Sequence, residues 1–527
     1  MFEFLKTGID GLDAVLGGGI RYPASSSAFV FVTGGAGSGK TMMALEMLTR
    51  AWMSGAEGST FLYYSVEHSP RNLVAKLSAD FDYYGSDQEV VELEQEVEHK
   101  ICLQTESPNG QTRLILTQAQ TGGLQDQDEG FRVDVEWILA EIGNYDLGQK
   151  VGMVCIDNVG LLLTDLDYFG KRARLLATRR ALMARQIHGI FVQEETDTRD
   201  LRLPTAEEFS TDVLIRLSYE NPATDFKMRV LEIQKARHQY YYRGTHHFSI
   251  AGRGIQRDVY LGARNERGPG IHVYPSIAAQ LSLARDSAVF RVPSRGSEPI
   301  DLGHPDLNAA FHADYRPTAR SSTVLLAEPG TRYTYLALRF LAVARQEDQP
   351  ALMVSTKEDR EALRQICSQS EALRPILDPD GAGFHKDFRL LYLHPEFISA
   401  GKFAWDIMRV AQGGHGQSSD GPMSRLVFDN IYQLGNRFPL LANQHFMVRA
   451  LLDLLRYQGV TPLFVDIVPR SPRPGQQGFD AAPYMTTFDN VLHLSLDETE
   501  EGEARPIIRA LKATGMESLQ NPIPLRY

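Results

Sequence analysis

The stretch that decides the fold is "SSSAFVFVTGGAGSGKTMMALEMLTRA" (residues 25–51), which runs from an apolar strand through a glycine-rich loop into a helix. Within it, Gly34, Gly39, Lys40 and Thr41 satisfy the pattern G-x-x-x-x-G-K-T. The glycines let successive backbone N–H groups curl around phosphates, because glycine takes the required dihedrals cheaply. The following helix directs the positive end of its dipole at the same place. The sequence therefore predicts a loop that binds the phosphates of ATP.

Three side chains near this loop are candidates for the chemistry. We expect Lys40 to neutralise the β and γ oxygens and the Thr41 hydroxyl to ligate Mg²⁺. Asp157 ends a second apolar run, "VGMVCIDNVG", where a carboxylate supports the metal; the alternative is an Asp that only caps the next turn. The expected metal ligands are thus Thr41 and Asp157. The expected nucleotide contacts are Gly34, Gly35, Ala36, Gly37, Ser38, Gly39, Lys40, Thr41 and Met42.

A third apolar run, "TFLYYSVEHSP" (60–70), places Glu67 at its end. A carboxylate there would orient and deprotonate the attacking water, so Glu67 is the expected catalytic base beside Lys40. His68 either assists or is an ordinary surface or packing residue.

The totals limit the class of protein. A chain of 527 residues is too long for one hydrophobic core, which predicts two large domains. The net charge of −12 argues against a protein whose main task is to coat nucleic acid. The three cysteines are far apart, as expected in a reducing cytosol, and no apolar run reaches the roughly 18 residues of a membrane span. We therefore expect a cytoplasmic protein without membrane contact.

Strands and helices alternate along the first half, which predicts a parallel sheet covered by helices. "DVLIRLSY" and "MRVLEIQK" follow as a predicted hairpin. The acidic stretch 86–99 is predicted to be a solvated helix, and the polar stretch 104–130 a long loop. The predicted strands lie near 28–34, 60–66, 151–157 and 189–194, and the predicted helices near 40–53, 70–80 and 171–188.

Several segments of the first 280 residues together resemble the KaiC-like branch of the RecA superfamily. The most specific is "TGIDGLDAVLGGGI" (7–20), which such ATPases have just before the loop strand. The others are "GGAGSGKT" (34–41), "VEHS" (66–69), "AEEFSTDVLIRLSYE" (206–220), "VLEIQKARH" (230–238) and "GIHVYP" (270–275).

This resemblance implies a RecA-like core that assembles as a ring, often a hexamer, with ATP at the subunit interfaces. It places Glu67 at the family's catalytic glutamate, where members commonly have two adjacent glutamates; here His68 takes the second position. It also places Lys235 and Arg237 where the family reaches across to the neighbour's γ-phosphate, so both are expected catalytic residues supplied in trans. The alternative is that both are solvated strand residues.

The second half repeats the first with altered chemistry. "AEPGTRYTYLALRFL" (327–341) aligns with the loop and helix of the first half, and "RLVFDNIYQL" (425–434) aligns Asp429 with Asp157. The fold expected is α/β: two tandem RecA-like P-loop domains, 1–284 and 285–527, each a mostly parallel sheet flanked by helices with a C-terminal β-hairpin extension. In the second domain Arg332 and Tyr333 replace the last loop glycine and the lysine, Lys357 replaces the catalytic glutamate, and Thr514 replaces Arg237.

These losses predict no hydrolysis in the second domain, while residual nucleotide or anion binding through Arg332 and Thr334 stays open. Without a phosphate donor nearby, no autokinase activity is expected at Thr486 or Thr487.

The function expected is that of a KaiC-like ring ATPase that acts as a nucleotide-dependent switch or assembly platform in signalling or defence. One alternative is a RecA-like DNA recombination or repair ATPase; another is a scaffold that binds ATP without hydrolysing it. Residues 229–267 hold eight Lys or Arg against three acids, with tyrosines between them. They are interpreted as an elaborated subunit interface, although a protein partner or single-stranded nucleic acid would also fit. The second domain is another candidate surface for a protein partner.

Overall fold

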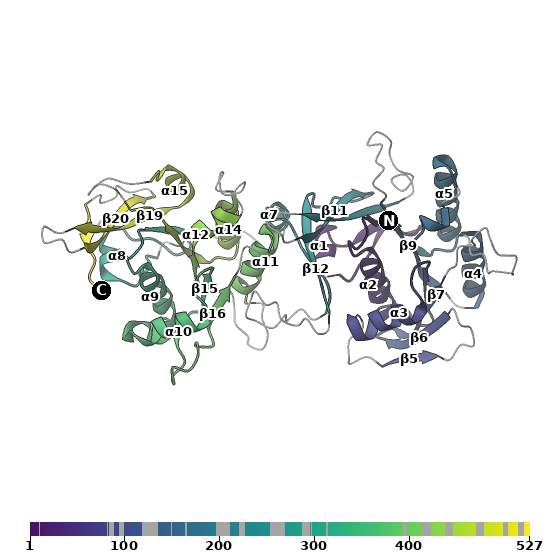
Figure 1. The fold of residues 1–527 in the computed structure, drawn as a ribbon, viewed down its shortest axis with the longest axis horizontal. Coiled ribbons are helices and arrows are strands. Elements are labelled where there is room, and N and C mark those ends of the chain that lie inside the picture. The colour runs from purple at the N-terminus through teal and green to yellow at the C-terminus, as the bar shows by residue number, and fades with distance from the viewer. Residues whose placement is uncertain are drawn as a thin grey trace. The chain divides into compact units, whose positions relative to one another are not determined.

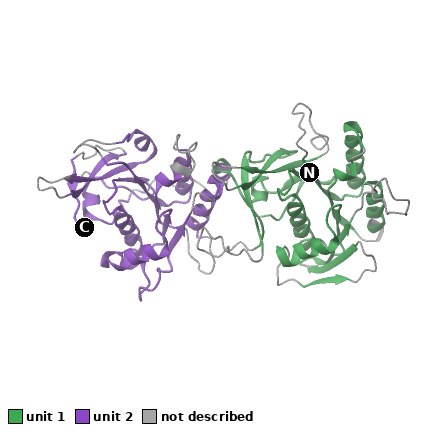
Figure 2. Cartoon of the chain, viewed as in Figure 1, with its two compact units in different colours: residues 1–256, 267–279 green, residues 257–266, 280–527 purple. Residues whose placement is uncertain are grey.

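The computed structural model describes most of the chain in two compact units (Figure 1). Unit 1 comprises residues 1–256 and 267–279, and unit 2 comprises residues 257–266 and 280–527 (Figure 2). The domain boundary predicted after residue 284 stays a prediction. None of the helices described is long and apolar enough to cross a bilayer. The described residues are 1–9, 11–81, 83, 89–93, 100–118, 135–148, 150–163, 166–195, 211–220, 227–252, 269–286, 296, 298–311, 315–393, 398–413, 423–437, 446–470, 479–498, 504–514 and 521–527.

Unit 1 is built on a mixed sheet with the order β13-β12-β11-β10-β3-β9-β8-β4-β7-β6-β5. The strands from β10 to β7 are parallel, and antiparallel strands extend the sheet at both edges. A separate ribbon pairs β1 with β2. The strands are β1 Phe2–Leu5, β2 Ile20–Pro23, β3 Phe29–Gly34, β4 Thr60–Ser65, β5 Val90–Leu93, β6 Lys100–Ser107, β7 Gly110–Gln118, β8 Val151–Asp157, β9 His188–Glu194, β10 Val213–Glu220, β11 Met228–Ala236, β12 Thr245–Ala251 and β13 Gly270–Tyr274.

Helices cover both faces of this sheet, as expected for parallel strands that are apolar on both sides. On one face α2 buries Met43, Leu45 and Leu48 against the central strands, and on the other α4 and α5 bury Ile138 and Leu182. The helices are α1 Leu12–Val15, α2 Lys40–Met53, α3 Pro70–Ala75 with a π turn over Lys76–Asp80, α4 Val135–Gly148, a 3₁₀ turn over Leu161–Leu163, and α5 Tyr168–Ala184; α7, Ile277–Asp286, follows β13.

Unit 2 is built on a sheet with the order β16-β15-β17-β18-β14-β19-β20-β21. Its strands are parallel from β16 to β19 and antiparallel beyond. The strands are β14 Thr323–Ala327, β15 Ala351–Ser355, β16 Phe388–Tyr392, β17 Arg425–Asp429, β18 Thr461–Ile467, β19 Asn490–Glu498, β20 Ala504–Ala513 and β21 Ile523–Pro524. The helices are α8 Pro305–Ala309, α9 Tyr333–Gln346, α10 Arg360–Ser368, a 3₁₀ turn over Glu371–Ile376, α11 Ala400–Ala411, α12 Ile431–Arg437, α14 Phe446–Tyr457 and α15 Ala482–Thr487.

The two sheets share one topology, with the segment β7-β4-β8-β9-β3-β10-β11-β12 of unit 1 matching the whole sheet of unit 2 in order and direction. Both central hairpins have a register shift at the same place, between Leu214 and Ile215 in β10 and between Val491 and Leu492 in β19. The predicted α/β fold of tandem RecA-like units, each with an antiparallel extension after the parallel strands, is confirmed.

Two predictions about the first half were wrong. The acidic stretch 86–99, predicted as a helix, contains strand β5, and the polar stretch 104–130, predicted as a loop, contains parts of β6 and β7. Strand β7 lies between β4 and β6, so both neighbours satisfy its backbone and its alternate side chains Leu114 and Leu116 are buried. Pairing with neighbours therefore outweighs local polarity, which a reading of the sequence alone cannot measure.

Candidate functional site

The glycine-rich loop joins the end of β3 to the start of α2 in unit 1. Gly39 caps α2 with φ of 104°, in the left-handed region, and a Cβ added there would lie 3.0 Å from Ile250 Cδ1. The position therefore favours glycine on both counts. Lys40 Nζ donates a hydrogen bond to the Gly35 carbonyl at 2.9 Å, and Tyr219 Oη donates one to the Gly37 carbonyl at 2.6 Å. The loop is thus held by its own lysine and by a tyrosine of β10.

Asp157 lies at the carboxyl end of β8, directly beside the loop. Tyr63 Oη donates to its Oδ2 at 2.7 Å. Burial raises the pKa of Asp157; interactions with Tyr63 and Thr41 oppose that effect, and the Glu67 charge adds to it. Because burial disfavours the charged form of this carboxyl group, a cation bound beside it would stabilise the carboxylate.

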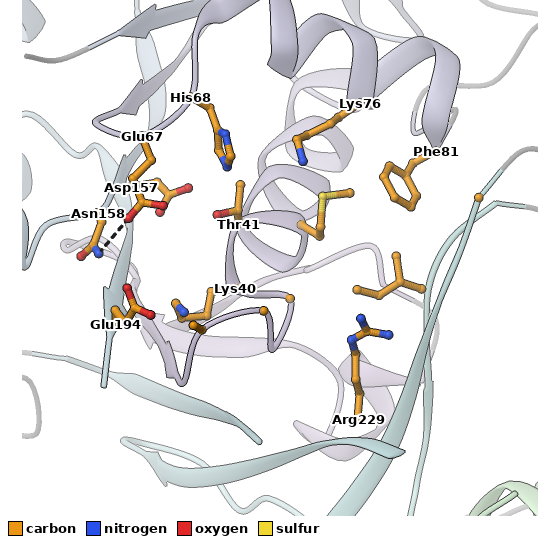
Figure 3. Close-up of a pocket in the computed structure, with 16 residues that line it drawn as sticks. Lys40, Thr41, Glu67, His68, Lys76, Phe81, Asp157, Asn158, Glu194 and Arg229 are labelled. Atoms are coloured by element: carbon orange, nitrogen blue, oxygen red, sulfur yellow. Dashed lines mark hydrogen bonds between the residues drawn. The ribbon is translucent and has the colours of Figure 1, made fainter. Parts of the chain in front are cut away.

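Glu67 follows the end of β4, the strand next to β8. The Asn158 side-chain nitrogen donates to Glu67 Oε1 at 3.4 Å, and this contact is the dashed line in Figure 3. The His68 backbone N–H bonds Ser65 Oγ at 2.9 Å, which fixes the turn that presents Glu67. Glu67 itself is exposed, so its carboxylate is accessible to a water molecule.

These residues surround one cavity of about 620 Å³. The size suits a nucleotide, since ligand pockets span roughly 300–1,000 Å³. Mg²⁺ is usually held by one or two protein oxygens together with substrate phosphates, and Thr41 and Asp157 offer such oxygens beside the loop. The residues present therefore fit ATP with Mg²⁺. Of the predicted site residues, Ala36, Gly37, Gly39, Lys40, Thr41, Met42, Glu67 and Asp157 line this cavity; Gly34, Gly35 and Ser38 belong to the loop but are not among its lining residues.

The cavity has further lining residues that the sequence analysis did not predict. Lys76 begins the π turn after α3, and π turns inside helices are frequent at functional sites. Phe81, directly after that turn, and Arg229 of β11 also line the cavity (Figure 3). Glu194 ends β9, and its carboxylate faces Lys40 in Figure 3. Its place at the carboxyl end of a central parallel strand, as for Asp157, is a signal that would have identified it.

Lys235 and Arg237 lie elsewhere in unit 1 and are not among the residues that line the described cavity. Lys235 pairs with Leu214 beside the register shift of the β10–β11 hairpin, and the Arg237 N–H donates to the Asp212 carbonyl at 2.7 Å. Both side chains are partly exposed. The fold therefore displays them at a surface away from the phosphate-binding loop of the same chain.

Residues 5–258 match the family described as "ATPase: KaiC". The first half of this chain is a KaiC-like P-loop ATPase domain of the RecA superfamily. The circadian clock oscillator protein KaiC of Parathermosynechococcus lividus is 23% identical to the chain over 261 residues. That match covers 49% of this chain and 41% of the relative, so it spans about two fifths of the relative's length.

Unit 2 repeats the backbone of the KaiC-like domain and changes its side chains. Gly34 pairs with Leu217, and Ala327 pairs with Leu494 in the equivalent strands, which aligns Lys40 with Tyr333. Arg332 caps α9 with φ of 50°, in the same left-handed region as Gly39. The backbone thus keeps the path of a phosphate-binding loop even where a bulky residue must take an unfavourable conformation.

The aligned catalytic positions of unit 2 differ as well. The N–H of Glu358 bonds Ser355 Oγ just as that of His68 bonds Ser65, so Lys357 occupies the position of Glu67. Lys357 forms an ion pair with Glu358 at 2.7 Å, and its Nζ lies 6.0 Å from the centre of the Tyr333 ring. A cation therefore stands where unit 1 has a carboxylate.

Proposed function

We propose that unit 1 binds ATP with Mg²⁺ and hydrolyses it slowly, and that the chain assembles into a ring, often a hexamer in such ATPases, that works as a nucleotide-dependent switch or assembly platform. The observation that carries this is the cavity in which Lys40, Thr41, Asp157 and Glu67 meet. A role in signalling or defence completes the proposal and rests on the resemblance alone. A cytoplasmic location is proposed as well, from the three scattered cysteines.

Some residues of the cavity bind ATP, and others act in its hydrolysis. On binding ATP, Lys40 exchanges its bond to the Gly35 carbonyl for phosphate oxygens, which places positive charge at the β and γ groups. Thr41 and Asp157 would hold Mg²⁺, which would supply positive charge beside the phosphates. Glu67, held by Asn158, orients the attacking water and accepts its proton. Since His68 stands beside it in place of a second glutamate, the proposed turnover is slow.

Hydrolysis would also require a neighbouring copy. Lys235 and Arg237 sit outside the cavity of their own chain, whereas a cation aimed at the γ-phosphate is needed for efficient phosphoryl transfer. The proposal therefore has one copy supply these two residues to the site of the next, with ATP at the interface. This arrangement makes turnover depend on assembly.

Unit 2 is proposed to be a pseudo-ATPase that stabilises the ring or docks a protein partner. Unit 2 lacks the loop lysine, the catalytic base and the trans-acting arginine that are proposed for unit 1. Their positions are occupied by Tyr333, Lys357 and Thr514. The Thr514 N–H donates to the Asp489 carbonyl as the Arg237 N–H donates to the Asp212 carbonyl, which fixes that alignment. We propose no hydrolysis and no autokinase activity there.

The test of this function combines particle size with turnover. Wild-type protein should sediment as a larger particle with ATP than with ADP or without nucleotide, and phosphate release should rise more than linearly with protein concentration. Glu67→Gln should keep the large particle and lose phosphate release. Unchanged phosphate release by Glu67→Gln would contradict the assignment of the base, and a monomer under all conditions would contradict the ring.

A further inference from the structure

The ribbon formed by β1 and β2 has one buried and one exposed face. Its register pairs Phe4 with Arg21 and Phe2 with Pro23 across the two strands. Because side chains alternate along a strand, Phe2 and Phe4 point to the same side. The opposite side is buried along β2: Tyr22 is buried, and its hydroxyl donates to Oε2 of the exposed Glu3 at 2.8 Å. The two phenylalanines are therefore left on the outward face.

Both phenylalanines are strongly exposed. Phe2 is 43% exposed and Phe4 is 51% exposed, and Tyr240, just beyond β11, is 70% exposed. We call these three side chains the aromatic face. Aromatic and arginine residues are enriched at protein interfaces, whereas neighbouring exposed phenylalanines on a monomer surface are unfavourable in water.

The aromatic face is joined to the strand end that carries Arg237. The Phe2 ring lies 5.4 Å from the ring of His238, and the Arg21 guanidinium lies 4.3 Å above Phe2. Arg21 also donates to the His238 carbonyl at 3.0 Å, and Gln239 bonds the carbonyls of Leu16 and Gly19. The ribbon and the residues after β11 therefore form one continuous surface, with Arg237 at its border.

We propose that the aromatic face packs against a second copy of this chain, at the rim of that copy's cavity, and positions Arg237 for the neighbour's γ-phosphate. This inference rests on the proposed function, because it names the surface that would deliver the trans-acting cation. Phe2, Phe4 and Tyr240 are then positioning residues that do not touch the nucleotide.

A second copy fits this surface better than another partner because of where Arg237 lies. Arg237 directly precedes His238, whose ring contacts Phe2, and it does not line the cavity of its own chain. The same contact that covers the aromatic rings would therefore complete a site in the neighbouring copy.

The test compares one double change and one single change of exposed aromatic residues in the full chain. Phe2→Ser combined with Phe4→Ser removes the ribbon part of the aromatic face, and Phe169→Ser is the matched control, since Phe169 is 74% exposed at the start of α5. We expect the first variant to need at least about tenfold more protein for ATP-dependent assembly, because central aromatic residues dominate interface energies. ATP binding to the dilute protein should stay within about twofold of wild type, and Phe169→Ser should assemble as wild type does.

A second measurement stands even if the double variant folds poorly. Replacing Phe4 with the photoreactive aromatic p-benzoyl-phenylalanine should give a cross-link between two chains with ATP, on a peptide at the neighbour's cavity rim, and much less of it without nucleotide. Assembly of the double variant at the wild-type concentration, an equal effect of Phe169→Ser, or cross-links confined to one chain would overturn this inference alone. A wild-type protein that stays monomeric with ATP would overturn the proposed ring as well.

Discussion

Two loops, residues 34–40 and 327–333, follow the same backbone path but end in different side chains. Both leave a central parallel strand, both reach a helix through a residue in the left-handed region, and both lie between equivalent neighbouring strands. Yet one ends in Gly39 and Lys40 and the other in Arg332 and Tyr333. The comparison teaches that the sheet and helix determine the path of the loop, while the two side chains at its end set the charge and the space that a phosphate group would meet.

The residues that surround the two loops also differ between the units. Asp157 receives a hydrogen bond from Tyr63, but the equivalent strand position in unit 2 is Met353, and burial raises the pKa of Asp429 to about 6. The register of the antiparallel strands places Tyr527 at the position that Ile250 has in unit 1. The Arg332 guanidinium lies 4.9 Å above the Tyr527 ring, so groups of unit 2 itself cover its loop.

The largest expected effect concerns the trans-acting cations. Arg237→Ala should lower phosphate release on the order of 10³-fold, because a cation at the γ-phosphate contributes about 10³–10⁵ in such reactions. Thr514→Ala, at the aligned position of unit 2, should leave phosphate release unchanged. Mixing Arg237→Ala with Lys40→Ala protein should restore part of the activity, since each supplies what the other lacks. Normal turnover by both single variants would show that Arg237 is only a solvated strand residue.

A smaller loss is expected at the base. Glu67→Gln should reduce phosphate release about 10²-fold or more while ATP still binds, because general base catalysis contributes about 10²–10⁴. Lys357→Gln is the matched change in unit 2 and should have no effect on turnover. Single-turnover measurements separate the chemical step from assembly. An equal effect of the two changes would remove the distinction between the units.

A further change concerns the loop lysine. Lys40→Ala should weaken ATP binding by about tenfold to a hundredfold, since each charge-assisted hydrogen bond contributes about 1.5–3 kcal/mol. Tyr333→Ala should change ATP affinity by less than about twofold. Titration with a fluorescent ATP analogue measures both. If Tyr333→Ala weakened binding as much as Lys40→Ala, unit 2 would have to be counted as a nucleotide site.

The smallest expected effect is on stability. Glu46 is buried in α2, where burial raises the pKa of its carboxyl to about 7, and the aligned residue of α9 is Arg339. The pKa of this carboxyl is higher in the folded state than its value of 4.5 in the unfolded chain, so the protonated Glu46 stabilises the folded state at low pH. This stabilisation is lost as the pH rises to about 7. The free energy of unfolding of unit 1, relative to Glu46→Gln, should therefore fall by about 1–3 kcal/mol from pH 5 to pH 8. Hydrogen exchange of peptides from α2, with α9 peptides as the control, would measure this pH dependence of stability. The same pH dependence in wild-type and Glu46→Gln protein would exclude Glu46 as the cause.

The central elements could be predicted from the sequence because their signals are local. Residues 40–53 follow a glycine-rich loop with apolar helical spacing, and the helix observed has those bounds. Strand β8 is likewise a continuous apolar run that ends in Asp157. The helix predicted near 171–188 begins earlier, at Tyr168, because the Asp167 side chain accepts a hydrogen bond from the Gly170 N–H and caps it.

The rest of the site depends on contacts between distant segments. Arg229 reaches the cavity from the β10–β11 hairpin, and Lys76 and Phe81 reach it through a π turn. Those positions carry no motif, since neither the hairpin register nor an extra residue in a helical turn has a sequence signature. The predicted role of residues 253–267 lies outside the described residues. Thr486 and Thr487, on α15, bond the Pro483 carbonyl, and the expectation that they are not phosphorylated stays a prediction.

The central claim is that one loop binds nucleotide and its repeat does not, and the most direct test is the number of nucleotides bound per chain. Calorimetric titration of Glu67→Gln protein with ATP and Mg²⁺ avoids turnover and counts sites. We predict one ATP per chain, with none left when Lys40→Ala is added and no change when Tyr333→Ala is added. Two ATP per chain, or one ATP that persists in the Lys40→Ala protein, would contradict the account.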